Sequence, residues 1–256
     1  MISIFNEEKY ALNVLKNGFI SNKQGLELFI LAKYYRFKHN KDKTECKELL
    51  KQFCESQVED YNNSELYTKV NSTIKQAYDK DARLLAINNI KFNQYELDYI
   101  NSLNVSSVGK QILFGLWCCN KLNIEAEQSD KWVNITYTEL KKFCNLSNGN
   151  MIKIMNELYN NNLIFISDRC ALCLTFLEDY DKFLQDNSLP SSINYYEITD
   201  FTTCGLWWQK YNGNKKIIEC AECEILTIRN SNRQKYCKKC AREKELDKQI
   251  RYNAKR

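Results

Sequence analysis

Four cysteines have the residue type and the spacing to bind a metal ion. Cys220 and Cys223 form one CxxC pair, and Cys237 and Cys240 form a second pair after thirteen intervening residues. Two pairs at this distance supply four thiolates for one tetrahedral zinc ion. A redox dithiol needs only one CxxC pair, so the paired arrangement favours metal binding. Since the protein provides all four ligands, no position remains for a substrate, and we expect the zinc to be structural.

The elements around these cysteines must bring the two pairs together. We expect each pair to lie on a short turn, with the intervening residues folded as a hairpin. This stretch is too short to bury a core of its own. Metal binding is therefore expected to provide its folding free energy.

Positive charge gathers around the same cysteines. Residues 229–256 contain eleven Lys/Arg and three Asp/Glu, a net charge of +8, whereas the whole chain carries only +5. A compact zinc module with a positive tail indicates a polyanionic partner, most simply nucleic acid. A solvated tail that only aids solubility is the alternative. The residues expected to contact phosphates are Arg229, Arg233, Lys235, Lys238, Lys239 and Arg242.

The other eight cysteines are expected to be buried thiols, because they are scattered and mostly at apolar positions. Cys170 and Cys173 also spell CxxC, but a predicted strand there sends the two sulfurs to opposite faces. The sequence begins without the basic and apolar regions of a secretion signal and has no run of about 18 apolar residues. We therefore expect a reducing, cytoplasmic location and no membrane partner.

The sequence shows no constellation that indicates catalysis. His39 is the only histidine, which removes any His-pair metal site and any obvious Ser-His triad. A nuclease or primase needs converging carboxylates, and we find no acidic doublet on an evident strand and no Gly-rich phosphate loop. The aromatic and basic residues at 34–39 could touch a phosphate backbone, but a helix end with core tyrosines explains them more simply. We predict that the protein is not an enzyme and has no catalytic residue.

Helical periodicity dominates residues 1–104. Apolar residues recur at i, i+3, i+4 and i+7 in three stretches, which predicts three amphipathic helices. Asp42 followed by Glu45 is a capping box that starts the middle helix. The three stripes are Leu26, Phe29, Ile30, Tyr34 and Phe37, then Cys46, Leu49, Leu50 and Phe53, then Leu66, Val70, Ile74, Ala77 and Tyr78.

Residues 105–180 have the order of elements that a winged helix requires. A mostly apolar helix over 106–122 precedes a short extended piece over 132–135 and a short helix opened by the capping box of Thr136 and Glu139. A polar turn leads to a helix ending near Leu158, and two strands follow, over 163–166 and 171–177. Short helix, turn, longer helix and β-hairpin together form a winged helix-turn-helix.

The segment from Leu146 and Ser147 to Ile164 resembles the winged-helix family. There, a turn serine precedes the recognition helix, and a polar-Leu-Ile step leads into the wing. The resemblance implies that Lys153, Asn156 and Asn160 face a major groove, where Asn bonds to adenine edges. Many winged helices instead dock proteins or dimerise, so both roles stay open.

Residues 217–256 look like a small zinc ribbon. Their Arg-x-Lys-Tyr-Cys-x-x-Cys stretch, which ends at Cys240, is similar to terminal ribbons in proteins of Gram-positive bacterial phages and mobile elements. Those ribbons also carry a charged helical tail. The resemblance implies a four-cysteine zinc site and a phage or mobile-element origin, and for a phage protein the host-cell cytoplasm.

Together these patterns predict a mainly helical α+β protein. We expect a helical domain over residues 1–104, a winged-helix-like domain over 105–180, a linker and packing segment over 181–216, and a zinc ribbon with a basic helical tail over 217–256. Pro190, the only proline, lies in the polar stretch that marks the clearest boundary. No pattern indicates an oligomeric state.

Two functional hypotheses follow. The first is a nucleic-acid-binding protein with a replication or regulatory role, for which DNA is favoured over RNA. The zinc module and basic tail would contact phosphates, and the winged helix would read sequence. The alternative is a protein-binding inhibitor or adaptor that docks on a host nucleic-acid machine, such as a defence or transcription complex. Direct binding weakens steeply as salt rises, whereas a protein interface built on apolar anchors holds.

Overall fold

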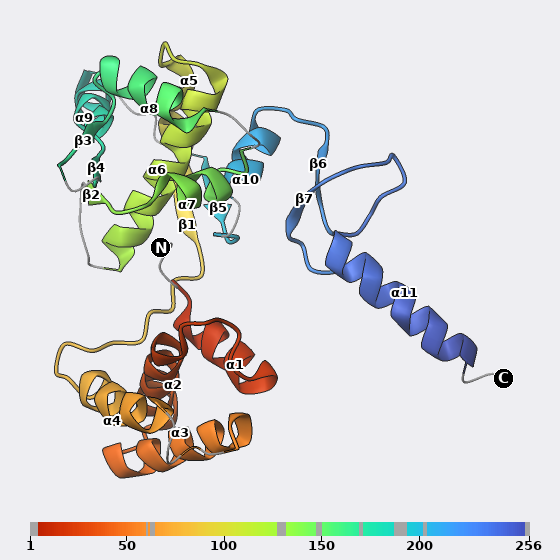
Figure 1. Ribbon diagram of the computed structural model, residues 1–256. Coiled ribbons are helices and arrows are strands. Elements are labelled where there is room, and N and C mark those ends of the chain that lie inside the picture. Colours follow the sequence, from red (N-terminus) through yellow and green to blue (C-terminus); the bar gives the residue numbers. More distant parts are fainter. Residues whose placement is uncertain are drawn as a thin grey trace. The chain divides into compact units, whose positions relative to one another are not determined.

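The computed structural model describes residues 5–59, 61, 65–126, 132–146, 150–168, 171–186, 194–201 and 204–253. Within these ranges the chain is mainly helical with small antiparallel sheets, as predicted, and it forms eleven helices and seven strands (Figure 1). The chain divides into two compact units, one over Ser3–Asn88 and one that contains Asn89–Arg256.

The first unit packs its helices around α2. Apolar residues occur so densely on α2 that Leu28, Ile30, Leu31 and Ala32 are each at most 1% exposed. A helix that is apolar around most of its circumference must be covered on several sides, and α1, α3 and α4 all pack against it. The bounds of these helices are α1 Glu7–Asn17, α2 Gln24–His39, α3 Lys43–Gln57 and α4 Glu65–Ala77.

Local chemistry sets the boundary between α2 and α3. Asn40 ends α2 in the left-handed region with a φ of 50°. The predicted capping box then starts α3: the Asp42 side chain accepts from the backbone N–H of Glu45 at 2.9 Å, and the Glu45 carboxylate accepts from the N–H of Asp42 at 3.1 Å.

The cations at 34–39 serve the fold of the first unit. Arg36 Nη1 donates to the carbonyl oxygens of Ala77 at 2.6 Å and Asp79 at 2.9 Å. These carbonyls lie at the C-terminal end of α4 and just beyond it, where a cation complements the helix dipole. Lys38 pairs with Glu8 at 2.6 Å. These contacts therefore fit the interpretation of residues 34–39 as a helix end better than the interpretation as a phosphate-binding cluster.

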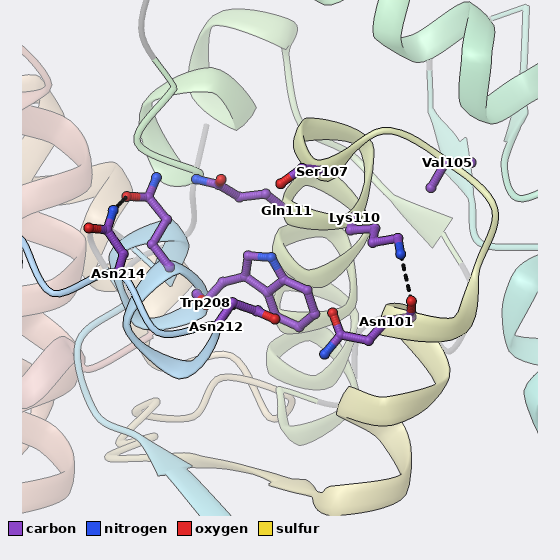
Figure 2. Close-up of a pocket in the computed structure, with 9 residues that line it drawn as sticks. Asn101, Val105, Ser107, Lys110, Gln111, Trp208, Asn212 and Asn214 are labelled. Carbon is purple, nitrogen blue, oxygen red and sulfur yellow. Dashed lines mark hydrogen bonds between the residues drawn. The ribbon is translucent and has the colours of Figure 1, made fainter.

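The second unit has α6 at its centre. Residues 111–120 of α6 are buried without a break, and α5, α7, α8 and α10 pack against this helix. Gly205 lets α10 approach closely, because a Cβ there would lie 1.9 Å from the carbonyl oxygen of Cys144. The first turn of α6 and α10 together line a cavity (Figure 2). The helix bounds are α5 Gln94–Ser102, α6 Ser107–Glu125, α7 Tyr137–Phe143, α8 Met151–Asn160 and α10 Cys204–Tyr211.

Short antiparallel sheets join distant segments of the second unit. β1 pairs with β5, with Phe92 opposite Tyr196. A second sheet has the order β2-β4-β3. Residues 90–102, at the end of the expected helical domain, lie in this unit. The strand bounds are β1 Ile90–Asn93, β2 Trp132–Val133, β3 Phe165–Ile166, β4 Leu172–Cys173 and β5 Tyr195–Ile198.

The strand predicted over residues 171–177 is too long. It ends at Cys173, and a helix, α9, spans Phe176–Asp186 where the pattern predicts the end of the strand and the start of a linker. Phe176 and Tyr180 lie one helical turn apart, and both pack edge-to-face on Trp117 of α6, with ring centroids 5.4 and 5.0 Å away. Burying this aromatic pair outweighs the local β propensity of the segment.

Some expected features lie outside the described residues, namely Cys170, Ser147 and the stretch around Pro190. The described cysteines apart from the two C-terminal pairs are buried, except for half-buried Cys173: they are Cys46, Cys54, Cys118, Cys119, Cys144 and Cys204. Their burial agrees with the expectation of core thiols. Among the helices that the structure describes, none combines the length and the apolar character needed to cross a bilayer.

Candidate metal centre and its basic surface

A short hairpin carries the first cysteine pair. The chain turns through Cys220 and Cys223 between the antiparallel strands β6 and β7. The N–H of Cys220 donates to the carbonyl of Ile225 at 3.0 Å, and the N–H of Glu224 donates to the carbonyl of Cys220 at 2.9 Å. Glu224 adopts a φ of 59°, the left-handed conformation that closes the turn. The elements of this module are β6 Ile217–Glu219, β7 Leu226–Ile228 and α11 Lys238–Asn253.

The second cysteine pair lies at the start of α11. Cys237 directly precedes the helix, and its carbonyl accepts from the N–H of Ala241 at 2.9 Å, the first turn of the helical ladder. The N–H of Ala221 donates to the carbonyl of Lys235 at 2.9 Å. That bond ties the turn of the first pair to the segment that leads into the second, so the backbone itself brings the two pairs together.

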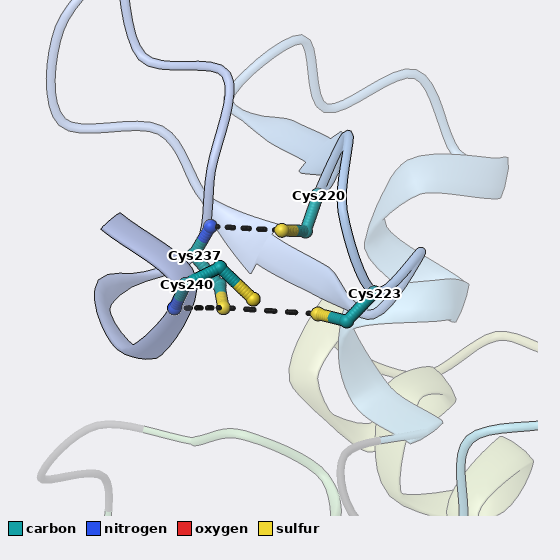
Figure 3. Close-up of side chains that lie close together, drawn as sticks. All are labelled: Cys220, Cys223, Cys237 and Cys240. Atoms are coloured by element: carbon teal, nitrogen blue, oxygen red, sulfur yellow. Dashed lines mark hydrogen bonds between the residues drawn. The ribbon is translucent and has the colours of Figure 1, made fainter. Parts of the chain in front are cut away.

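The four sulfur atoms converge on one point (Figure 3). The Sγ atoms of Cys220, Cys223, Cys237 and Cys240 all lie within 4.8 Å of one another. A tetrahedral zinc ion with Zn–S bonds of about 2.3 Å separates its sulfur ligands by about 3.8 Å. The Sγ atoms of Cys223 and Cys237 are 3.8 Å apart. The predicted ligand set is therefore assembled, and it is compatible with zinc.

Backbone N–H groups point at these sulfurs. The N–H of Cys237 donates to Cys220 Sγ at 3.2 Å, and the N–H of Cys240 donates to Cys237 Sγ at 3.5 Å. Burial alone would raise the pKa of Cys220, but the N–H groups of Cys237, Cys223 and Glu222 outweigh it and lower that pKa to about 6. The lowered pKa favours the thiolate, which is the form that ligates metal.

Cys240 holds its thiol proton more tightly than Cys220 does. Hydrogen bonds to the sulfurs of Cys223 and Cys237 raise the pKa of Cys240. Four thiolates so close together repel one another unless a cation lies between them, and a bound divalent metal deprotonates its thiol ligands outright. The donor set thus fits a metal ion better than it fits four free thiols.

Contacts around the cysteines fix the rest of the module. The strands β6 and β7 pack against α10, and Lys210 of α10 forms an ion pair with Glu219 of β6. Lys244 of α11 pairs with Glu222 at 2.7 Å and lies 5.0 Å from the ring centroid of Tyr236. Lys244 is thus engaged within the module, a role that its place in a basic run does not indicate.

The cations predicted to contact phosphates lie on the outside of the module. Five of them are exposed, and Arg229 is half-buried. Within the described residues, Lys239 alone among the six has an acidic partner, Glu243, at 4.0 Å. The exposed five are Arg233, Lys235, Lys238, Lys239 and Arg242. Most of the positive charge near the metal site is therefore available to a partner.

The other predicted contacts lie on α8. Lys153, Asn156 and Asn160 are exposed and line one open cavity of ≈ 730 Å³. Glu157 beside them accepts from the backbone N–H of Ser106 at 2.6 Å and from its Oγ at 2.7 Å. This carboxylate therefore caps α6, a pairing across 51 residues that spacing along the chain does not reveal.

The arrangement of these residues suits metal binding. Four sulfurs lie close enough to hold a metal ion and could fill all four positions of a tetrahedral site, and exposed cations lie around them. No protein-family model, curated protein or solved structure matches this chain.

Proposed function

We propose that the protein binds nucleic acid through the zinc module and its surrounding cations, as a replication or regulatory factor of a phage or mobile element. The observation that carries the proposal is the set of six cations on one metal-braced module, of which only Lys239 has an acidic partner in the described part of the chain. Metal ligation holds the hairpin and the start of α11 together. Binding through these cations therefore costs less ordering entropy than binding through a free tail.

Phosphate is the chemistry that this surface suits best. Arginine and lysine donors form charge-assisted hydrogen bonds with phosphate oxygens, arginine often with two at once. Each phosphate that a protein neutralises on duplex DNA releases counterions, which makes the affinity fall with salt. If all six cations contact phosphates, the slope of log K against log[salt] is about −5.

We propose further that residues 105–180 form a winged helix and that α8 reads DNA. In support, α7, a turn and α8 are followed by β3 and β4, and β2 completes a sheet in the order β2-β4-β3. This is the order of elements in a winged helix-turn-helix. Asn156 and Asn160 are exposed on α8, and asparagine bonds to two atoms of adenine in a major groove. DNA is thus the favoured polymer.

Fluorescence anisotropy with a labelled DNA duplex tests the proposal. The variant combines Lys235→Ser, Lys238→Ser and Lys239→Ser, and the matched control combines Lys47→Ser, Lys75→Ser and Lys80→Ser, three exposed lysines of the first unit. We expect the variant to make the salt slope shallower by about 3 and to lower the affinity, while the control keeps the slope of the unaltered protein.

Two outcomes would contradict this function. One is binding that does not change with salt. The other is an equal loss in variant and control, which would place the contacts outside the zinc module. Zinc content measured on both variants ensures that the comparison is made between metal-loaded proteins.

A separate observation favours an inhibitor or adaptor as the second candidate function. Large apolar side chains are exposed on α8, with Ile152 at 63% and Tyr159 at 47%, and on the neighbouring sheet, with Trp132 at 40% and Phe165 at 47%. Exposed aromatic and aliphatic anchors are typical of protein docking surfaces. A pull-down from bacterial lysate, repeated with nuclease, separates the candidates. A nucleic-acid-processing protein that stays bound after nuclease supports the adaptor, and loss of every partner supports direct binding.

A further inference from the structure

A polar cavity of ≈ 580 Å³ lies in the second unit, apart from the cysteine cluster and the α8 surface. Its walls come from the end of α5, the first turn of α6, and α10 with the turn that follows it (Figure 2). Its size is within the range of about 300–1,000 Å³ that is usual for small-molecule sites.

The walls of this cavity are rich in carboxamides. Among the described residues that line it, Lys110 is the only charged one, and none is a carboxylate. Each carboxamide has both hydrogen-bond donors and acceptors, as the edges of nucleobases do. The carboxamides are those of Asn101, Gln111, Gln209, Asn212 and Asn214.

Two polar groups in the wall have hydrogen-bonding capacity that the described residues do not use. Trp208 is 4% exposed and lines the cavity, and its indole N–H has no hydrogen-bond partner in the described part of the chain. In Figure 2 the indole nitrogen faces the side of the cavity where Gln111 and Ser107 lie. This nitrogen is not one of the fully buried polar atoms without a partner, so a ligand in the cavity can reach it.

Gln111 complements this donor with an acceptor. It is 6% exposed, and its Nε2 donates to the carbonyl of Cys144 at 2.5 Å, which fixes the orientation of the amide. The Oε1 atom receives no hydrogen bond from the described residues, and the residue lines the cavity. One donor and one acceptor, both on well-packed side chains, therefore border the same space.

Lys110 gives the cavity a cationic end. Its Nζ donates to the backbone carbonyl of Asn101 at 2.5 Å, which positions the ammonium and leaves two of its three hydrogens for a ligand. The side chain is half-buried. A ligand phosphate beside it would form charge-assisted hydrogen bonds.

We propose that this cavity binds a nucleoside monophosphate. The base would meet Trp208 N–H, Gln111 Oε1 and the carboxamides, and the phosphate would meet Lys110. The described lining residues include no carboxylate, which disfavours a cationic ligand, and the polar walls disfavour a lipid. This site uses none of the cations of the zinc module. Ligand binding in the cavity can therefore be tested independently of nucleic-acid binding by that module.

The indole N–H of Trp208 supplies a direct readout. The chain has four tryptophans, so a ¹H–¹⁵N spectrum of the full zinc-loaded protein shows four indole signals, and Trp208→Phe identifies one of them by its loss. We expect that signal to shift saturably with AMP, CMP, GMP or UMP, with a Kd below about 1 mM for at least one. Adenosine and inorganic phosphate are titrated separately, so that the contributions of the base and of the phosphate to the binding affinity can be distinguished.

Lys110→Met tests the cationic end of the site. We expect it to weaken monophosphate binding about tenfold and to leave adenosine binding unchanged, whereas Lys142→Met, an exposed lysine of α7 that does not line the cavity, changes neither. The proposal is overturned if no nucleotide shifts the Trp208 signal, which would mean that only water fills the space. It is equally overturned if phosphate alone reproduces the shift, or if the two lysine variants behave alike.

Discussion

The first unit and the proposed zinc module differ in how many apolar side chains they bury. In the first unit, residues such as Leu28, Leu31 and Leu50 are fully buried in a core shared by α1 to α4. Between residues 217 and 253, only Ile217, Cys220 and Cys240 are buried. One region therefore distributes its stability over many apolar contacts, whereas the other has few buried side chains and would depend on a metal ion held by its four sulfurs. Altering one of these two regions and measuring both therefore tests the comparison.

Removing one sulfur has the largest expected effect. Structural zinc contributes about 10–16 kcal/mol of apparent binding free energy in small modules, and that energy is available only to the folded form. We expect Cys237→Ser to release zinc and to disorder the residues beyond Tyr211, while the first unit stays folded. Elemental analysis and limited proteolysis measure the two effects.

The control for this variant is Cys54→Ala, which changes a buried thiol of the first unit. It should keep zinc at one ion per chain. Cooperative unfolding of the whole protein on Cys237→Ser would contradict the division between a region held by its core and a region held by its metal.

A core truncation tests the other side of the comparison. Leu31 is fully buried at the centre of the first unit, so Leu31→Ala leaves a cavity there. We expect a loss of about 2–5 kcal/mol in the free energy of unfolding of this unit, with no loss of zinc. Urea unfolding monitored by hydrogen exchange measures the free energy of unfolding of the first unit separately. A fall in zinc content with this variant would show that the two regions are coupled.

Alkaline pH is expected to weaken the first unit more modestly. Burial raises the pKa of Cys46 and of Cys54 to about 11, above the ordinary value near 9. Between pH 9 and 11 the unfolded chain has lost thiol protons that the folded unit keeps, so the free energy of unfolding falls as pH rises through this window. The zinc module has the opposite dependence, because its ligands must be deprotonated and acid releases the metal.

Urea midpoints at pH 8 and 10.5 measure the alkaline effect. Cys54→Ala should show a smaller drop between the two pH values, since one of the two shifted thiols is gone. A midpoint that rises with pH would show that burial does not govern these thiols.

The contrast also explains what the sequence could predict. Local patterns were sufficient where one segment determines its own structure, as in the capping box of Asp42 and Glu45 and the two CxxC pairs, whose ligands now lie together. The helix α9 was missed because its formation depends on Trp117, a distant residue that buries Phe176. Long-range pairing of this kind leaves no periodic signal in a single segment.

The cavity beside α10 could not be predicted for the same reason. Gln111 and Trp208 lie almost a hundred positions apart in the sequence, and neither belongs to a recognisable motif. Their shared wall exists only because Gly205 lets α10 pack closely in the second unit. A sequence motif can reveal metal-binding residues that lie on one turn. A site assembled from separate helices can be recognised only once the fold is known.

The smallest expected effect comes from Lys244→Ala. The ion pair with Glu222 joins α11 to the turn of the first cysteine pair, but both side chains are well exposed, at 39% and 52%, and water screens such pairs. We therefore expect unchanged zinc affinity and only faster local motion at the start of α11, measured by ¹⁵N relaxation. Lys248→Ala, further along the same helix, is the control and should leave that motion unaltered. If Lys244→Ala instead lowered zinc affinity substantially, the module would owe its stability to contacts around the metal site as well as to the sulfurs, and the contrast with the first unit would narrow.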